Sequence, residues 1–183
     1  MPETPMQKIN VVGTSGSGKT TFGRQLAQTL NCPYLEMDAL FWLPNWGEPS
    51  DAEFFTRLTQ ALVGESWILD GNYNRTRDIK WAQVDTVIWL DYSLLRTLYQ
   101  ALKRALVRSL SGREIWPGTG NVETFRKSFL SQDSIVLWTL KTYHANRQRY
   151  QNVQELPDYQ HIHFIRLRSP HQARLFLSRL ASG

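Results

Sequence analysis

The sequence lacks several features that would point to other classes of protein. Its single cysteine, Cys32, excludes an internal disulfide and a zinc site built from cysteines. No apolar run approaches the roughly 20 residues that a membrane-spanning helix needs. Residues 1–5 hold an acid and two prolines in place of the apolar core of a secretory signal. These absences predict a cytoplasmic protein without a membrane segment.

Length and composition predict one globular domain over residues 1–183. A chain of 183 residues is long enough to bury a core, and a hydrophobic content of 42% is typical of globular proteins. The formal net charge of +5 favours polyanionic partners, which include both nucleotides and nucleic acids.

One motif is complete. Residues 13–20 match the phosphate-binding pattern G-x-x-x-x-G-K-[ST], with an apolar run at 9–12 before it and a helical repeat over 19–30 after it. Backbone N–H groups of such a loop, together with the helix N-terminus, bind phosphate. We expect Lys19 to reach the β- and γ-phosphates of ATP and Thr20 to ligate Mg²⁺. The predicted nucleotide-binding set is Gly13, Thr14, Ser15, Gly16, Ser17, Gly18, Lys19, Thr20 and Thr21.

Apolar strands alternate with amphipathic helices along the chain. This order predicts an α/β fold in which helices cover both faces of a parallel sheet. We expect strands at 8–12, 34–37, 67–69, 86–90 and 162–167, and helices at 19–30, from 50, at 94–110, at 122–151 and from 169. Residues 111–121, rich in glycine, are expected to form a mobile loop. Ligands of such sheets bind beyond the carboxyl ends of the strands.

Two strands end in an aspartate, Asp70 or Asp91, and either one can partner Mg²⁺. We assign Asp70, with Thr20, to the metal. Neither aspartate is followed by the glutamate that activates water in many motor ATPases, which favours transfer to a substrate over hydrolysis. The guanine-selecting motif Asn-Lys-x-Asp is absent, which favours ATP over GTP.

At this point the chain resembles the adenylate kinases. Residues 70–76, Asp-Gly-Asn-Tyr-Asn-Arg-Thr, look like the Asp-Gly-Phe-Pro-Arg-Thr segment of that family, with one residue inserted before the arginine. Residues 38–46 are closer still to the small adenylate-kinase-like group labelled topology-modulation proteins. The resemblance implies a three-layer P-loop NTPase fold with a five-stranded parallel sheet, a substrate-binding segment at 38–64 and a helical lid at 104–150. It also implies that Asp38 and Arg75 face the acceptor.

The chain departs from that family at the acceptor. Phe41 and Trp42 stand where adenylate kinases carry an arginine that grips AMP, and the inserted residue leaves open whether Arg75 or Arg77 contacts a phosphate. Transfer to a nucleoside monophosphate and transfer to a hydroxyl, with Asp38 as hydrogen-bond partner or general base as in shikimate-kinase-like enzymes, therefore both stay open.

Residues 93–113 hold five cations and no acid. Arg104 and Arg108 lie one helical turn apart, and guanidinium groups clamp a transferring phosphoryl group well. On the following helix Arg147 is the candidate to close over the nucleotide. The predicted catalytic set is Lys19, Asp38, Arg75, Arg104, Arg108 and Arg147.

These features favour an ATP- and Mg²⁺-dependent small-molecule kinase resembling the nucleotide kinases. A nucleotide-binding regulator that acts on nucleic acid is a second hypothesis, suggested by the basic charge, although the chain has no helix-turn-helix or zinc motif. A P-loop ATPase module with little kinase activity is a third.

Overall fold

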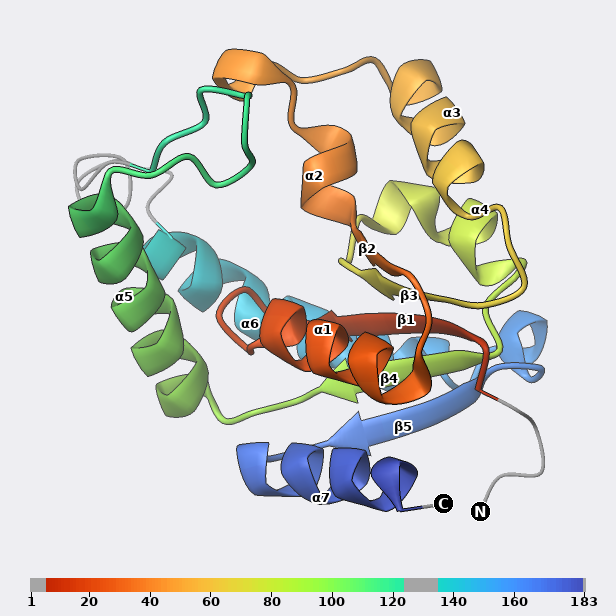
Figure 1. Cartoon of the computed structure of the whole chain (residues 1–183). Coiled ribbons are helices and arrows are strands. Elements are labelled where there is room, and N and C mark those ends of the chain that lie inside the picture. The colour runs from red at the N-terminus through yellow and green to blue at the C-terminus, as the bar shows by residue number, and fades with distance from the viewer. Residues whose placement is uncertain (1–5, 124–134, 183) are drawn as a thin grey trace.

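The computed structural model describes residues 6–123 and 135–182. Five parallel strands form one sheet in the order β2-β3-β1-β4-β5 (Figure 1). This confirms the predicted α/β fold and its five-stranded parallel sheet. The strands are β1 (Lys8–Gly13), β2 (Tyr34–Glu36), β3 (Trp67–Asp70), β4 (Thr86–Leu90) and β5 (His163–Leu167).

The central position of β1 brings the predicted site residues to one edge of the sheet. Val11 of β1 lies level with Asp70 at the end of β3, and Gly13 lies level with Leu90 at the end of β4. Since all the strands are parallel, the phosphate loop after β1 and the polar residues after β3 and β4 emerge side by side.

Helices cover both faces of the sheet (Figure 1). One face packs against α1 and α7, and the other against α2, α3, α4 and α6, while α5 packs against α6. The helices are α1 (Lys19–Leu30), α2 (Met37–Phe41), α3 (Asp51–Ala61), α4 (Arg77–Trp81), α5 (Leu94–Ser111), α6 (Ile135–Val153) and α7 (Pro170–Ala181). Short 3₁₀ turns are η1 (Pro44–Trp46), η2 (Asn74–Thr76) and η4 (Pro157–Tyr159).

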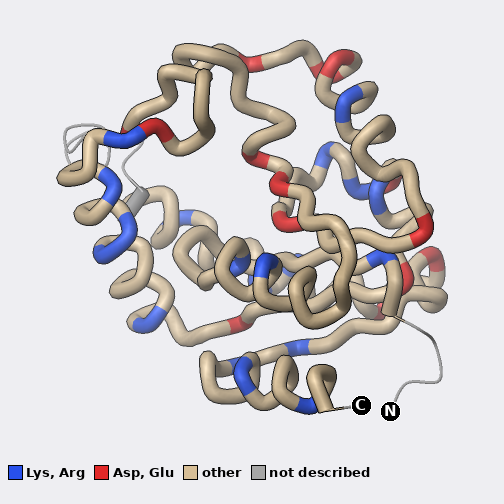
Figure 2. Tube along the Cα trace, viewed as in Figure 1, with Lys and Arg blue, Asp and Glu red and all other residues tan. Residues whose placement is uncertain are grey.

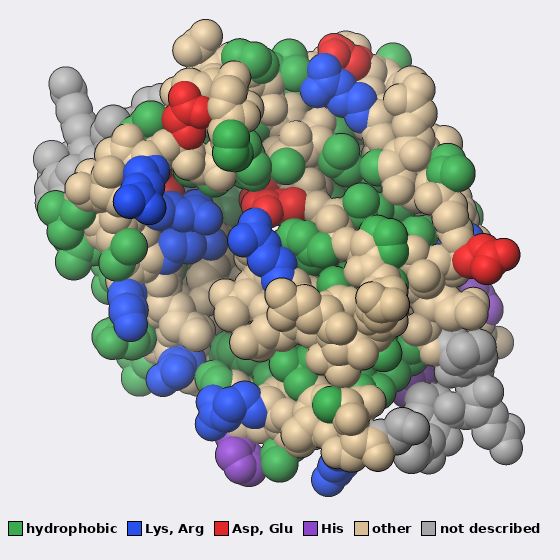
Figure 3. All heavy atoms as spheres, viewed as in Figure 1, with side chains coloured by type: hydrophobic (Ala, Val, Ile, Leu, Met, Phe, Trp, Pro, Cys, Tyr) green, Lys and Arg blue, Asp and Glu red, His purple; other side chains and the backbone are tan. Residues whose placement is uncertain are grey.

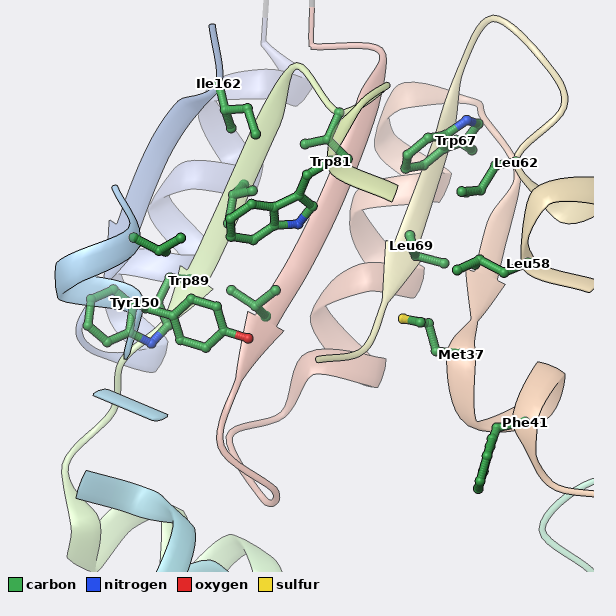
Figure 4. Packing of buried hydrophobic residues seen from close by; sticks show 14 of the residues in the cluster. Met37, Phe41, Leu58, Leu62, Trp67, Leu69, Trp81, Trp89, Tyr150 and Ile162 are labelled. Atoms are coloured by element: carbon green, nitrogen blue, oxygen red, sulfur yellow. The ribbon is translucent and has the colours of Figure 1, made fainter. Parts of the chain in front are cut away.

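The core on the α2–α4 face is rich in aromatic rings (Figure 4). Trp67 of β3 and Trp89 of β4 are both buried in the core. Ser50 and Ser169 cap the helices expected from 50 and 169, α3 and α7, each accepting a hydrogen bond from the backbone N–H three residues on.

Some local predictions are wrong. The helix expected at 122–151 does not begin at Val122, which instead forms an isolated bridge with Glu114; residues 124–134 lie outside the described part, and α6 is described from Ile135. Helices α2 and α4 were not predicted, because five-residue helices are too short to show an apolar repeat.

Helix α5 forms where expected but does not bury its leucine repeat. It turns small residues inward, among them Ala101 and Ala105, and leaves Leu95 and Leu110 exposed. None of the helices in the described residues is both long and apolar enough to cross a bilayer.

Candidate active site

The phosphate loop has the backbone that its glycines predict. Gly16 and Gly18 adopt left-handed φ angles of 85° and 87°. A side chain at Gly16 would also collide with α5, since its Cβ would lie 2.7 Å from the carbonyl oxygen of Thr97 and 2.8 Å from the Cβ of Ala101. The small inward face of α5 is therefore explained by its contact with the loop.

Lys19 and Thr20 lie at the start of α1, directly after the loop. The Lys19 ammonium donates to the carbonyl oxygen of Thr14 at 3.3 Å. Burial lowers the pKa of Lys19, and the nearby carboxylate of Asp70 opposes that shift. The Thr20 hydroxyl donates to Oδ2 of Asp70 at 2.7 Å, as does the Tyr34 hydroxyl at 2.9 Å.

The structure distinguishes the two candidate metal aspartates. Asp70 is buried beside Thr20, whereas Oδ2 of Asp91 accepts a hydrogen bond from Nε of Arg166 at 2.9 Å and lies 3.3 Å from Nε of Arg147. These ion pairs occupy Asp91. They also give Arg147, predicted to close over the nucleotide, a carboxylate partner at the end of β4.

Hydroxyl and carboxylate oxygens are the donors that Mg²⁺ prefers, and kinase sites usually combine one or two protein ligands with phosphate oxygens. Thr20 and Asp70 fit that pattern. No group of three or more His, Cys, Asp or Glu side chains placed to hold a metal occurs within residues 6–123 and 135–182.

Arg104 reaches the phosphate loop from α5. Its guanidinium donates to Oγ of Ser15 at 3.0 Å, and burial, followed by the charge of Arg108, lowers its pKa. Arg108 pairs with Glu123 at 3.4 Å. Figure 2 shows Lys and Arg along α5 with no Asp or Glu on that helix. In Figure 3 these cations face acidic side chains across a hollow.

The acidic side chains opposite come from the β2–α2 junction. Oδ1 of Asp38 accepts a hydrogen bond from the Tyr73 hydroxyl at 2.8 Å. Glu36 pairs with Arg24 at 3.2 Å, and burial together with the charges of Asp70 and Asp38 raises its pKa. Sequence reasoning missed Glu36, although it stands two residues before Asp38 at the end of a strand.

The two candidate arginines after β3 diverge. Arg75 pairs with Asp51 of α3 at 3.0 Å and stacks over the ring of Phe41, 5.0 Å from its centroid. Arg77 lies over the ring of Tyr159, on the other side of the turn, at 5.4 Å. Arg75 is therefore the arginine on the side of the 38–64 segment.

Asn72 is a site residue that the sequence did not reveal. Its side chain accepts from the backbone N–H of Gly13 at 3.1 Å and donates to the carbonyl oxygen of Gly13 at 2.8 Å. The Tyr150 hydroxyl of α6 donates to the same amide oxygen at 3.0 Å. Asn72 thus joins the start of the phosphate loop to α6.

The turn that carries Asn72 rests on a buried lysine. Lys80 of α4 donates to the carbonyl oxygens of Asn72 and of Gly71, the latter at 3.3 Å. Burial, and to a smaller extent the charge of Arg77, lowers the pKa of Lys80 to about 7. No local sequence signal marks this lysine, because its burial depends on α4, which was itself missed.

A second hollow lies beyond the carboxyl ends of β4 and β5. It has a volume of about 400 Å³ and is cationic, and its lining residues are Tyr92, Ser93, Arg96, Arg168, Ser169, Pro170, His171 and Arg174. It flanks the phosphate loop on the side opposite the 38–64 segment, since β4 and β5 lie on that side of β1.

The sheet order, the central phosphate loop and the arginine-bearing helix over it define a P-loop kinase with the nucleotide-kinase-like fold. The family model for shikimate kinase matches residues 15–60, which include most of the loop and all of α2. No curated protein matches the sequence.

Solved structures agree with this assignment of the fold. A shikimate kinase from Acinetobacter baumannii in complex with shikimate is 17% identical with a TM-score of 0.53, covering 96% of this chain and 90% of its own. A gluconokinase from Sinorhizobium meliloti is 17% identical with a TM-score of 0.50, covering 97% and 94%. A shikimate kinase from Bacteroides thetaiotaomicron is 15% identical with a TM-score of 0.53, covering 97% and 98%.

Proposed function

We propose that this protein transfers the γ-phosphoryl group of ATP, in a Mg²⁺-dependent reaction, to a hydroxyl group of a small acceptor. One observation carries the proposal. Lys19, Arg104 and the Thr20–Asp70 pair meet at the phosphate loop, and Asp38 follows β2 at the same carboxyl edge of the parallel sheet. A phosphoryl group bound by the cations would lie at an edge that also carries a carboxylate able to receive a proton.

ATP, the phosphoryl donor, would bind across the phosphate loop. Backbone N–H groups of residues 13–20 would hold the phosphates, and the hollow beside Arg168 would take the base and ribose. Thr20 and Asp70 would hold Mg²⁺, which when bound neutralises charge on the β- and γ-phosphate oxygens. Lys19 and Arg104 would stabilise the charge that develops on the transferring group.

Asp38 would act on the acceptor. Its carboxylate, held by the Tyr73 hydroxyl, would accept the proton as the acceptor oxygen bonds to the γ-phosphorus and the bond to the β–γ bridging oxygen breaks. ADP leaves with that bridging oxygen. The named activities of the structural neighbours, on shikimate and gluconate, support a hydroxyl acceptor over a nucleoside monophosphate.

Incubation with labelled ATP, Mg²⁺ and a panel of hydroxyl compounds and nucleoside monophosphates tests the proposal. We expect transfer of label to a hydroxyl compound, abolished by removal of Mg²⁺ with a chelator. Label that passes only to nucleoside monophosphates would contradict the hydroxyl acceptor. Salt-sensitive binding of duplex DNA without any turnover of ATP would favour the regulator instead.

A further inference from the structure

The acceptor side of the site is walled by a continuous run of aromatic rings. From Trp116 the run passes through Trp46 and Trp42 to Phe41, with neighbouring ring centroids 6.2, 5.3 and 5.0 Å apart. It continues through Phe54 to Tyr73, the residue that holds Asp38. Aromatic rings therefore extend up to the carboxylate that we assign to the acceptor.

The 111–121 loop, expected to be mobile, closes this wall by docking on the 38–64 segment. The buried side chain of Asn121 accepts from the backbone N–H of Trp46 at 2.6 Å and donates to the carbonyl oxygen of Leu43 at 3.0 Å. The backbone N–H of Asn45 donates to the carbonyl oxygen of Thr119 at 2.9 Å. These hydrogen bonds join the 111–121 loop to the backbone of residues 43–46. They hold Trp116 beside Trp46.

The charge of this region is the reverse of what an anionic acceptor needs. The sole cation of residues 38–64 is Arg57, which pairs with Glu53 at 2.7 Å, whereas the acids of that segment are Asp38, Glu48, Asp51 and Glu53. Arg75 is ion-paired to Asp51 at 3.0 Å. Lys19 and Arg104 are directed to the phosphate loop. In the 111–121 loop the charged residues are Arg113 and Glu114, and both are exposed. An acceptor carboxylate or phosphate would therefore meet mainly carboxylates along the wall.

We propose that the acceptor is a ring-bearing alcohol without an anionic group, such as a nucleoside or a neutral sugar, which stacks on the wall of Trp42, Trp46 and Trp116. This inference rests on the proposed function and narrows its substrate class. It separates this chain from its structural neighbours, since shikimate and gluconate both carry a carboxylate.

A binding measurement tests the wall without relying on turnover. Titration of the full chain with nucleosides, neutral sugars, the matching nucleoside monophosphates, shikimate and gluconate is followed by tryptophan fluorescence. We expect quenching by a neutral ring compound at lower concentration than by its anionic counterpart. Tighter binding of the anionic member of each pair would overturn the proposal.

A matched pair of variants locates the effect. Trp116→Leu should raise the KM for the neutral acceptor roughly tenfold with little change in the KM for ATP, because stacking on one ring contributes about that much. Trp138→Leu, in the exposed part of α6, should change neither. Circular dichroism checks that both variants fold, and equal effects of the two would contradict the wall.

The inference and the proposed function fail in different ways. A higher kcat/KM for a carboxylated or acyclic acceptor would overturn the inference and leave the kinase standing. Phosphoryl transfer to no member of the panel, together with tight quenching by neutral rings, would support the aromatic wall and contradict the kinase.

Discussion

At the donor end of the site, residues 13–20 and Arg104 gather positive charge and backbone N–H groups around one loop. At the acceptor end, residues 38–64 and the docked 111–121 loop present aromatic rings and carboxylates. Most of the donor end is one continuous stretch of sequence, residues 13–20, to which α5 adds Arg104. The acceptor end is assembled from segments far apart in the chain. Every P-loop kinase must bind a nucleotide at the donor end. The acceptor end is therefore where this protein would choose its acceptor.

The largest expected effect is at the donor end. Lys19→Ala should lower kcat for phosphoryl transfer by about 1,000-fold, because the ammonium would no longer stabilise charge on the transferring group. Lys103→Ala, an exposed lysine of α5, serves as the control in steady-state kinetics. Equal activity of the two variants would mean that the loop binds nucleotide without catalysing transfer.

Arg104 tests whether α5 belongs to the donor end. Arg104→Ala should lower kcat roughly 100- to 1,000-fold and leave the affinity for ATP nearly unchanged, as expected for a contact that strengthens in the transition state. Arg113→Ala, exposed beyond the end of α5, is the matched control. Losses of equal size in kcat and ATP affinity would mean that Arg104 contacts ATP in the ground state and gives no extra stabilisation to the transition state.

Asp38 tests the acceptor end. Asp38→Asn keeps an acceptor for the Tyr73 hydroxyl but loses the base, so kcat should fall roughly 100-fold while ATP binding persists. Asp158→Asn, on the exposed η4 turn, should leave kcat and ATP binding unchanged. Full activity of Asp38→Asn would exclude Asp38 as the base.

Asn72 links the two ends. Asn72→Ala removes both hydrogen bonds to Gly13, and we expect roughly tenfold weaker ATP binding and a loss of about 1–3 kcal/mol in unfolding free energy. Isothermal titration and urea denaturation measure the two quantities. Asn152→Ala, on the exposed side of α6, controls for loss of an asparagine. Unchanged ATP affinity would show that the loop holds its shape without Asn72.

The smallest effect is on the pH dependence of stability. The pKa of Lys80, about 7 in the folded chain against 10.5 when unfolded, means that the unfolded chain binds more protons between those values. Stability should therefore rise with pH over that window, by up to roughly 1 kcal/mol per unit from this lysine. Lys80→Met should flatten the rise in urea midpoints measured from pH 7 to 9. If the urea midpoints of both proteins rise equally with pH, Lys80 is hydrated in the folded chain and does not contribute to the rise.

Much of the donor end could be predicted from sequence because the phosphate loop, Lys19 and Thr20 are adjacent residues. A complete motif, a strand before it and a helix after it identify Lys19 and Thr20, and strand ends identify Asp70. The parallel sheet follows from alternating apolar runs. Both the motif and the alternation of strands and helices depend on the spacing of nearby residues, so they can be recognised without knowing the tertiary contacts.

The acceptor end could not be predicted in the same way. Three residues acquire their surroundings only through contacts between distant segments. Glu36 lies near Asp70, Asn72 bonds Gly13 and Tyr150, and Trp116 packs against Trp46. Helix α5 also could not be predicted from local sequence alone. Its leucine repeat indicates that the leucines are buried, yet the helix packs so closely on Gly16 that its alanines face inward instead. Tertiary contact overrides the periodic signal there.

The most direct test of the difference between the ends is to follow the γ-phosphoryl group by phosphorus NMR. The sample holds ATP, Mg²⁺ and an equimolar mixture of a nucleoside, a neutral sugar, the nucleoside monophosphate and shikimate. We predict that a phosphomonoester of the nucleoside or of the sugar grows in step with ADP, and that it is absent with Lys19→Ala. Growth of a nucleoside diphosphate or of a shikimate ester in its place, or of inorganic phosphate alone, would contradict the account.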